Sequence, residues 1–148
     1  MFKDRLMEKN KNSKGNIFIV EDDMLLSLVE ERLLMKLGYS VIGKSISGED
    51  AVPKIKAAKP DAILMDISLS GKMDGIDTMM EVRNFSSVPV IYLSGNSDQL
   101  NLERAKKTHY VDYLVKPITE YDLIEPLKKA IQTGYKSRTS KRSINHVG

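Results

Sequence analysis

Short apolar runs alternate with longer amphipathic segments along most of the chain. The first run, NIFIVE at 16–21, is rich in β-branched residues and lacks polar alternation, which is typical of a strand buried on both faces of a parallel sheet. The segment 23–37 follows with its apolar residues at helical spacing, and Gly38 ends it. The same pairing recurs four times, which predicts strands at 41–45, 62–66, 89–93 and 111–115 and helices at 47–58, 75–85, 98–108 and 119–133.

Five strands that are each followed by a helix predict an α/β domain. The crossovers should be right-handed, and the helices should cover both faces of a parallel sheet, so we expect a doubly wound (βα)5 architecture. Gly134 should end the last helix. In open sheets of this kind, ligands bind outside the carboxyl ends of the strands. The residues that follow each strand are therefore the candidates for chemistry.

Polar side chains stand at these strand ends. Glu21 and Asp22 follow the first strand, Asp66 ends the third, Ser94 follows the fourth and Lys116 the fifth. Carboxylates packed together raise one another's pKa unless a cation neutralises them, and Mg²⁺ binds one or two protein carboxylates together with phosphate oxygens. A lysine suits a phosphoryl oxygen, and an aspartate beside both cations can act as a nucleophile. The pattern predicts magnesium-assisted phosphoryl transfer to Asp66.

The motifs around these residues resemble those of the response-regulator receiver domain, the phosphoacceptor module of two-component signalling. The resemblance runs over about 16–133 and rests on IFIVEDD, ILMDISL, MDGID, YLSG and DYLVKP. It implies a flavodoxin-like sheet with strand order 2-1-3-4-5. It also implies a signalling protein that assists its own phosphotransfer and turns over no metabolite.

The resemblance implies a role for each residue of the predicted phosphorylation site. Asp66 matches the phosphoacceptor, and Glu21 and Asp22 match the acidic pair that positions Mg²⁺. The backbone carbonyl of Ser68 would be a further ligand of the metal. Lys116 matches the phosphate-binding lysine, and the peptide bond between Lys116 and Pro117 is expected to be cis.

Two further residues match the family's switch. Ser94 corresponds to the switch hydroxyl and Tyr113 to the switch aromatic, although a plain aromatic at the edge of the sheet stays an alternative for Tyr113. The chain departs from the family in having Ser70 where a proline is common, in a loop at 67–74 that is one residue longer, and in Gly95 in place of alanine. We expect the conformation of this loop to differ. Prolines inside two predicted helices should kink those helices or delay their start.

The resemblance also implies partners. The phosphoryl group would come from a histidine kinase or a phosphotransfer protein, and the output would be a contact with a downstream protein through the face built from 98–133. A phosphorylation-dependent homodimer is a further option. The short segment after Thr133 is too small for an output domain, so we expect a stand-alone receiver or one excised from a larger protein.

Composition narrows the class of protein. The 148 residues, 41% hydrophobic and 29% charged, suit one globular domain. The absence of cysteine excludes disulfides, thiolate nucleophiles and cysteine-ligated metal sites. The chain has no apolar run of about 18 residues, so we expect no membrane span and a cytoplasmic location.

The net charge of +3 comes from the two ends of the chain. Residues 1–15 carry five basic and two acidic side chains and 135–148 carry four basic and no acidic ones, which leaves −4 on 16–134. Short polar ends bury too little apolar surface to offset the entropy of ordering. We therefore expect mobile basic segments on either side of a receiver domain at 16–134.

Two other functions stay open. A small magnesium-dependent phosphatase or phosphotransferase with an aspartyl nucleophile would need a lid over its substrate, for which the loop at 67–74 is the candidate. A nucleic-acid binder that uses the basic ends is less favoured, and its binding would weaken strongly with salt.

Overall fold

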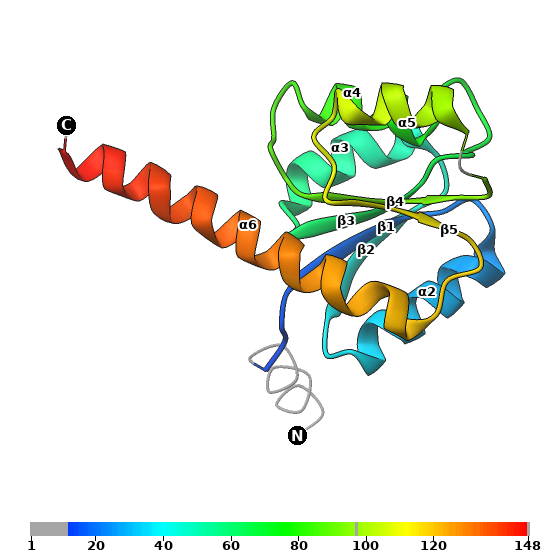
Figure 1. Ribbon diagram of the computed structural model, residues 1–148, viewed down its shortest axis with the longest axis horizontal. Coiled ribbons are helices and arrows are strands. Elements are labelled where there is room, and N and C mark those ends of the chain that lie inside the picture. The colour runs from blue at the N-terminus through cyan, green and yellow to red at the C-terminus, as the bar shows by residue number, and fades with distance from the viewer. Residues whose placement is uncertain (1–11, 97, 148) are drawn as a thin grey trace.

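A computed structural model describes residues 12–96 and 98–147 of the chain. Five parallel strands form one sheet in the order β2-β1-β3-β4-β5, and helices connect them (Figure 1). This confirms the predicted fold class and strand order. The strands are β1 (Asn16–Val20), β2 (Ser40–Ser45), β3 (Ala62–Asp66), β4 (Val90–Ser94) and β5 (Asp112–Val115). The helices are α2 (Met24–Lys36), α3 (Gly48–Ala58), α4 (Gly75–Val82), α5 (Gln99–Lys106) and α6 (Glu120–Val147).

The helices form one layer on each face of the sheet. Helices α3, α4 and α5 cover one face, and α2 and α6 cover the other (Figure 1). Alternate strand residues feed the two cores: Phe18, Ile63 and Tyr92 pack toward α3–α5, whereas Ile19 and Leu64 pack toward α2 and α6. Because β1, β3 and β4 are buried on both faces, they read as the continuous apolar runs seen in the sequence.

The strand register brings the predicted site residues to one edge. Val20 pairs with Met65, so the residue after β1 lies beside Asp66 at the end of β3. On the other side, Asp66 pairs with Leu93, and the next residue of β4, Ser94, pairs with Val115 at the end of β5. The carboxyl ends of four strands thus present their side chains together.

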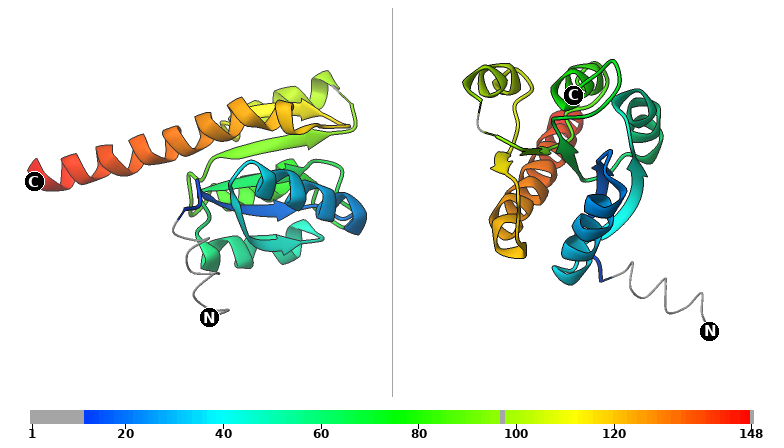
Figure 2. Two further views of the ribbon diagram at one scale, coloured as in Figure 1. Left: turned by 90° about the horizontal axis from the view of Figure 1, so that it is seen from below. Right: turned by 90° about the vertical axis from the view of Figure 1, so that its right-hand side faces the viewer.

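The last helix is longer than predicted. Helix α6 continues through Gly134 to Val147, and Figure 2 shows it extending well beyond the sheet. The prediction that it ends at Gly134 is wrong. Gly38, which does end a helix, has a φ of 97°, whereas Gly134 is not among the glycines with positive φ. An interior glycine costs only about 1 kcal/mol relative to alanine, and no proline follows to stop the helix.

The domain bounds predicted at 16–134 stay predictions. Residues 135–147 continue helix α6 without a break, and the mobility predicted for them is also still a prediction. At the other end, the backbone N–H of Lys14 donates to the carbonyl of Gly38 at 2.9 Å, so the folded domain begins before Asn16. The mobility predicted for 1–11 lies outside the described residues. Among the described residues, no helix combines the length and the apolar character needed to span a bilayer.

Candidate phosphorylation site

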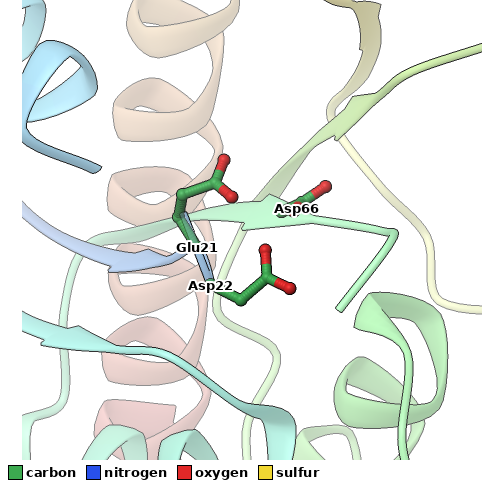
Figure 3. A group of neighbouring side chains, drawn as sticks. All are labelled: Glu21, Asp22 and Asp66. Carbon is green, nitrogen blue, oxygen red and sulfur yellow. The ribbon is translucent and has the colours of Figure 1, made fainter. Parts of the chain in front are cut away.

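Three carboxylates converge at the ends of β1 and β3. Oxygen atoms of Glu21, Asp22 and Asp66 lie within 4.8 Å of one another, and their side chains point into a common space (Figure 3). Glu21 and Asp66 are only 1% and 3% exposed, whereas Asp22 is half-buried. Such a set of oxygen ligands suits a hard divalent cation.

Backbone N–H groups fix each of these carboxylates. Ser68 donates its N–H to Asp66 Oδ1 at 3.1 Å, and Ser70 donates to Asp22 Oδ2 at 3.1 Å. Glu21 Oε2 accepts the N–H of Asp23 at 3.2 Å. The cluster is therefore held by the turns that follow β1 and β3.

Lys116 reaches the same cluster from the end of β5. Its Nζ lies 2.9 Å from Glu21 Oε1 and 3.3 Å from Asp66 Oδ1. The peptide bond between Lys116 and Pro117 is cis, as predicted. Burial opposes the charge of Lys116, but its hydrogen bond to Glu21 and the negative charge of Asp66 outweigh burial and raise its pKa. The lysine is a fixed positive charge beside Asp66.

The electrostatic balance of the site also involves a residue that sequence reasoning missed. Glu30 on the inner face of α2 is 4% exposed, and its burial together with Glu21 raises its pKa to about 9. Burial would raise the pKa of Glu21 as well, but hydrogen bonds with Glu30 and Lys116 outweigh it and lower that pKa. Glu30 is therefore protonated at neutral pH, and Glu21 is charged. An acidic residue at a buried position of the helical pattern was the available signal.

Asp66 is poised to bind a cation. Burial and the neighbouring Glu21 raise the pKa of Asp66 to about 6, while Lys116 opposes this rise. Two charged carboxylates beside one lysine leave the edge with excess negative charge. A divalent cation would relieve this repulsion, so the residues present fit Mg²⁺.

The predicted switch residues lie on the two neighbouring strands: Ser94 ends β4, and Tyr113 is the second residue of β5. The hydroxyl of Ser94, itself buried, donates to the backbone carbonyl of Asn96, and the hydroxyl of Tyr113 donates to the same carbonyl at 3.4 Å. The ring of Tyr113 packs against Tyr92 and Tyr110, with centroids 6.3 and 6.1 Å away. Both switch side chains thus share one acceptor in the turn after β4.

The longer loop at 67–74 is anchored by a second residue that sequence reasoning assigned to another role. Glu49, which the sequence placed at a helix start, accepts the backbone N–H groups of Lys72 and Met73 with Oε1 at 2.9 and 3.0 Å. Gly71 has a φ of 109°, a conformation that only glycine adopts readily, and a Cβ there would lie 3.2 Å from this carboxylate. These contacts hold the part of the loop that follows Ser70, the position at which the family commonly has a proline.

The far end of this loop joins two helices. Asp74 caps α4 and forms a capping box with Asp77. Arg104 of α5 donates to Asp74 Oδ2 at 2.8 Å and to Asp77 Oδ1 at 3.0 Å. The loop beside the carboxylates is thereby tied to the helix that follows β4.

The structure brings together four of the predicted site residues, Glu21, Asp22, Asp66 and Lys116, and places the backbone of Ser68 against Asp66. His109 lies exposed in the turn before β5.

Comparison with known proteins places this site in a family. The model of the response regulator receiver domain family matches residues 17–128. The transcriptional regulatory protein PdtaR of Mycobacterium tuberculosis is 31% identical over 115 residues, which cover 78% of this chain and 56% of that protein. The chemotaxis protein CheY of Thermotoga maritima is 32% identical over 114 residues, covering 76% of this chain and 94% of CheY.

A solved structure agrees with these relatives. The receiver domain of a modulated diguanylate cyclase from Desulfovibrio desulfuricans superposes with a TM-score of 0.77 at 31% identity, covering 83% of this chain and 98% of that one. The chain matches only about half the length of a curated relative such as PdtaR.

Proposed function

The chain belongs to the response regulator receiver domain family, and on this premise we propose that it is a phosphorylation-controlled signalling module whose phosphoacceptor is Asp66. One observation carries the assignment: Asp66 lies buried at the end of the central strand, with Lys116 3.3 Å away and the acidic pair beside it. A nucleophile, a fixed cation and a metal-binding pair meet at a single edge.

Mg²⁺ is the proposed cofactor. Glu21, Asp22 and Asp66 would hold it. The family resemblance adds the backbone carbonyl of Ser68 as a further ligand, and the N–H of that residue already donates to Asp66. When bound, the ion supplies positive charge to the oxygens of the transferring phosphoryl group. Lys116 meets the same developing charge from the β5 side.

The proposed reaction is transfer from a phosphohistidine. A carboxylate oxygen of Asp66 attacks phosphorus, the P–N bond breaks with its electron pair returning to the imidazole, and an acyl phosphate forms on Asp66. Asp66 must be ionised to attack, so its raised pKa of about 6 predicts slower transfer below that pH unless the cation is bound.

A histidine kinase or phosphotransfer protein is the proposed donor. Its phosphohistidine must reach Asp66, so it must contact the elements around this edge, and the outer face of α2 offers exposed apolar side chains there. Met24 and Leu25, two and three residues after Asp22, are 81% and 70% exposed. Burying such side chains favours association.

The proposed output is a protein contact through the 98–133 face, which also exposes apolar side chains: Leu100, Val115 and Tyr121. This face contains β5, which carries Tyr113, and α5. Helix α5 follows the turn whose Asn96 carbonyl accepts the Ser94 hydroxyl. A cytoplasmic location and a phosphorylation-dependent homodimer on the same face belong to this proposal.

The test is phosphorylation by a small donor in the presence of Mg²⁺. We expect acetyl phosphate to add one phosphoryl group that hydroxylamine removes, and Asp66→Asn to lose it completely, because an amide is no nucleophile at this site. Asp50→Asn is the matched control, since Asp50 pairs with Lys54 on the surface of α3 and should leave labelling unchanged. Intact-protein mass spectrometry gives the readout. Hydroxylamine-labile labelling of Asp66→Asn at the wild-type level would overturn the assignment.

A further inference from the structure

A second candidate site lies at the opposite end of the sheet from Asp66. Helix α6 leaves the sheet at this end (Figure 1). Residues around this point line a cavity of about 770 Å³. The end of α3, the segment between α4 and β4, the turn before β5 and the α6 backbone at Gly134 enclose it. Its size is that of sites for small organic molecules.

The floor of the cavity is apolar. Ile55 and Val88 are 2% and 8% exposed, and Pro60 and Pro89 are buried beside them. Phe85 is partly exposed and adds an aromatic wall. Such a floor binds the apolar body of a ligand by removing it from water.

The rim carries nitrogen side chains. Lys56 Nζ lies 5.5 Å from the centroid of the Phe85 ring, and Lys59 and His109 also line the opening. Asp61, the acidic residue among the lining residues, accepts the backbone N–H of Asn16 at 2.7 Å. The two ammonium groups of Lys56 and Lys59 outnumber this one carboxylate, so the charge at the rim favours an anionic group over a cationic one.

Backbone conformation supports a role for this rim. Lys59 and His109, with φ of 49° and 54°, are the two non-glycine residues with positive φ in the described part of the chain. This conformation is unfavourable for residues with a Cβ, and such residues cluster at ligand sites. Lys59 is also the C-cap of α3, where a positive charge is favoured. Helix capping accounts for the lysine, but it does not account for the apolar cavity beside it.

We propose that this cavity binds a small organic anion with an apolar, planar body. The anionic group, a carboxylate, sulfonate or phosphate, lies among Lys56, Lys59 and His109, and the body lies on Phe85 and the two prolines. The site is independent of phosphorylation at Asp66, so it stands or falls separately from the proposed function.

Naphthalenesulfonate is the probe for the first experiment, with naphthylmethylamine as its cationic counterpart. We expect saturable chemical-shift changes in a two-dimensional NMR titration of the full chain, confined to 55–61, 85–89, 109 and 133–134. The amine should bind at least about threefold more weakly, because its positive charge is repelled by the ammonium groups of the lysines at the rim. Changes centred elsewhere, or equal affinity for the amine, would overturn the proposal.

Three variants sharpen the test. The double variant Lys56→Gln, Lys59→Gln should weaken sulfonate binding about three- to tenfold. Gly134→Leu should abolish it, because a Cβ at Gly134 lies 3.8 Å from Pro89 Cγ on the cavity wall, and leucine favours the helix. Lys54→Gln is the control, since Lys54 lies on the same helix but pairs with Asp50 outside the cavity.

Unchanged affinity in Gly134→Leu, with its melting temperature at or above that of the wild type, would contradict the site. Phosphorylation by acetyl phosphate should stay at the wild-type level in all three variants, which separates this result from a failure at Asp66.

Discussion

The two halves of the phosphorylation edge are built differently. At the ends of β1 and β3, Glu21 and Asp66 are nearly inaccessible, and backbone N–H groups from the following turns fix the carboxylates. On β4 and β5, the hydroxyls of Ser94 and Tyr113 share one backbone carbonyl in an exposed turn. The half proposed to perform the chemistry is fixed by several backbone N–H groups, whereas in the half proposed to report it both hydroxyls depend on that one carbonyl.

Removing the Lys116 ammonium should lower the stability of the protein more than any other change proposed below. Lys116→Ala leaves two buried carboxylates without the ammonium that contacts both, so we expect the free energy of unfolding to fall by about 3 kcal/mol in metal-free buffer. Urea denaturation at pH 7 measures this. Lys128→Ala is the control: it removes a surface ion pair in which Lys128 Nζ lies 3.9 Å from Glu125 Oε1, and it should change the free energy of unfolding by less than about 0.5 kcal/mol. Equal effects of the two substitutions would contradict the claim that the Lys116 ammonium stabilises the buried carboxylates.

Replacing Glu30 by glutamine should raise the free energy of unfolding, the opposite of the effect of Lys116→Ala. Because folding raises its pKa to about 9, the folded state holds a proton that the unfolded state releases, so stability falls as pH rises from about 5 to 9. Glu30→Gln removes this loss and should raise the free energy of unfolding by about 2 kcal/mol at pH 7, with a smaller gain at pH 5. Urea denaturation across this range in metal-free buffer tests it, and a gain independent of pH would contradict the assignment.

Removing the Ser94 hydroxyl should remove only part of the gain in partner affinity that activation gives. A full population shift from 1:99 to 99:1 needs roughly 5.5 kcal/mol, and one hydrogen bond to a charged group contributes about 1.5–3 kcal/mol. Ser94→Ala should therefore keep part of the gain in partner affinity on adding beryllofluoride, losing about 1.5 kcal/mol of it, and Lys116→Ala should lose more. Titration of the partner with and without beryllofluoride measures the gain. An unchanged gain in both variants would mean that the signal leaves by another route.

The smallest effect is expected at the loop anchor. Glu49→Ala removes the acceptor of two backbone N–H groups in the loop that also positions Asp22 through Ser70, so Mg²⁺ affinity should fall roughly fivefold. Isothermal titration with Mg²⁺ measures it. Glu103→Ala, on the exposed face of α5, is the control and should leave the affinity unchanged.

Sequence reasoning recovered what local pattern and topology determine. Buried strands read as apolar runs, and the rule that ligands lie beyond strand ends was enough to bring Asp66 and Lys116 together. Glu30 was missed because its contact with Glu21 depends on how α2 packs back against β1, and Glu49 because its contacts depend on how α3 packs against the loop at 67–74. No local spacing encodes either packing. Gly134 misled for a related reason: whether a glycine ends a helix depends on its φ, which the sequence does not reveal.

The length of α6 has a mechanical consequence. Its 28 residues span roughly 40 Å, and its first turn lies four residues after Lys116. Among its described side chains, 120–134, Leu123, Leu127 and Ala130 are buried and root it against the sheet. A tilt of about 5° about this root would carry the backbone at Val147, roughly 25 Å beyond Ala130, through roughly 2 Å.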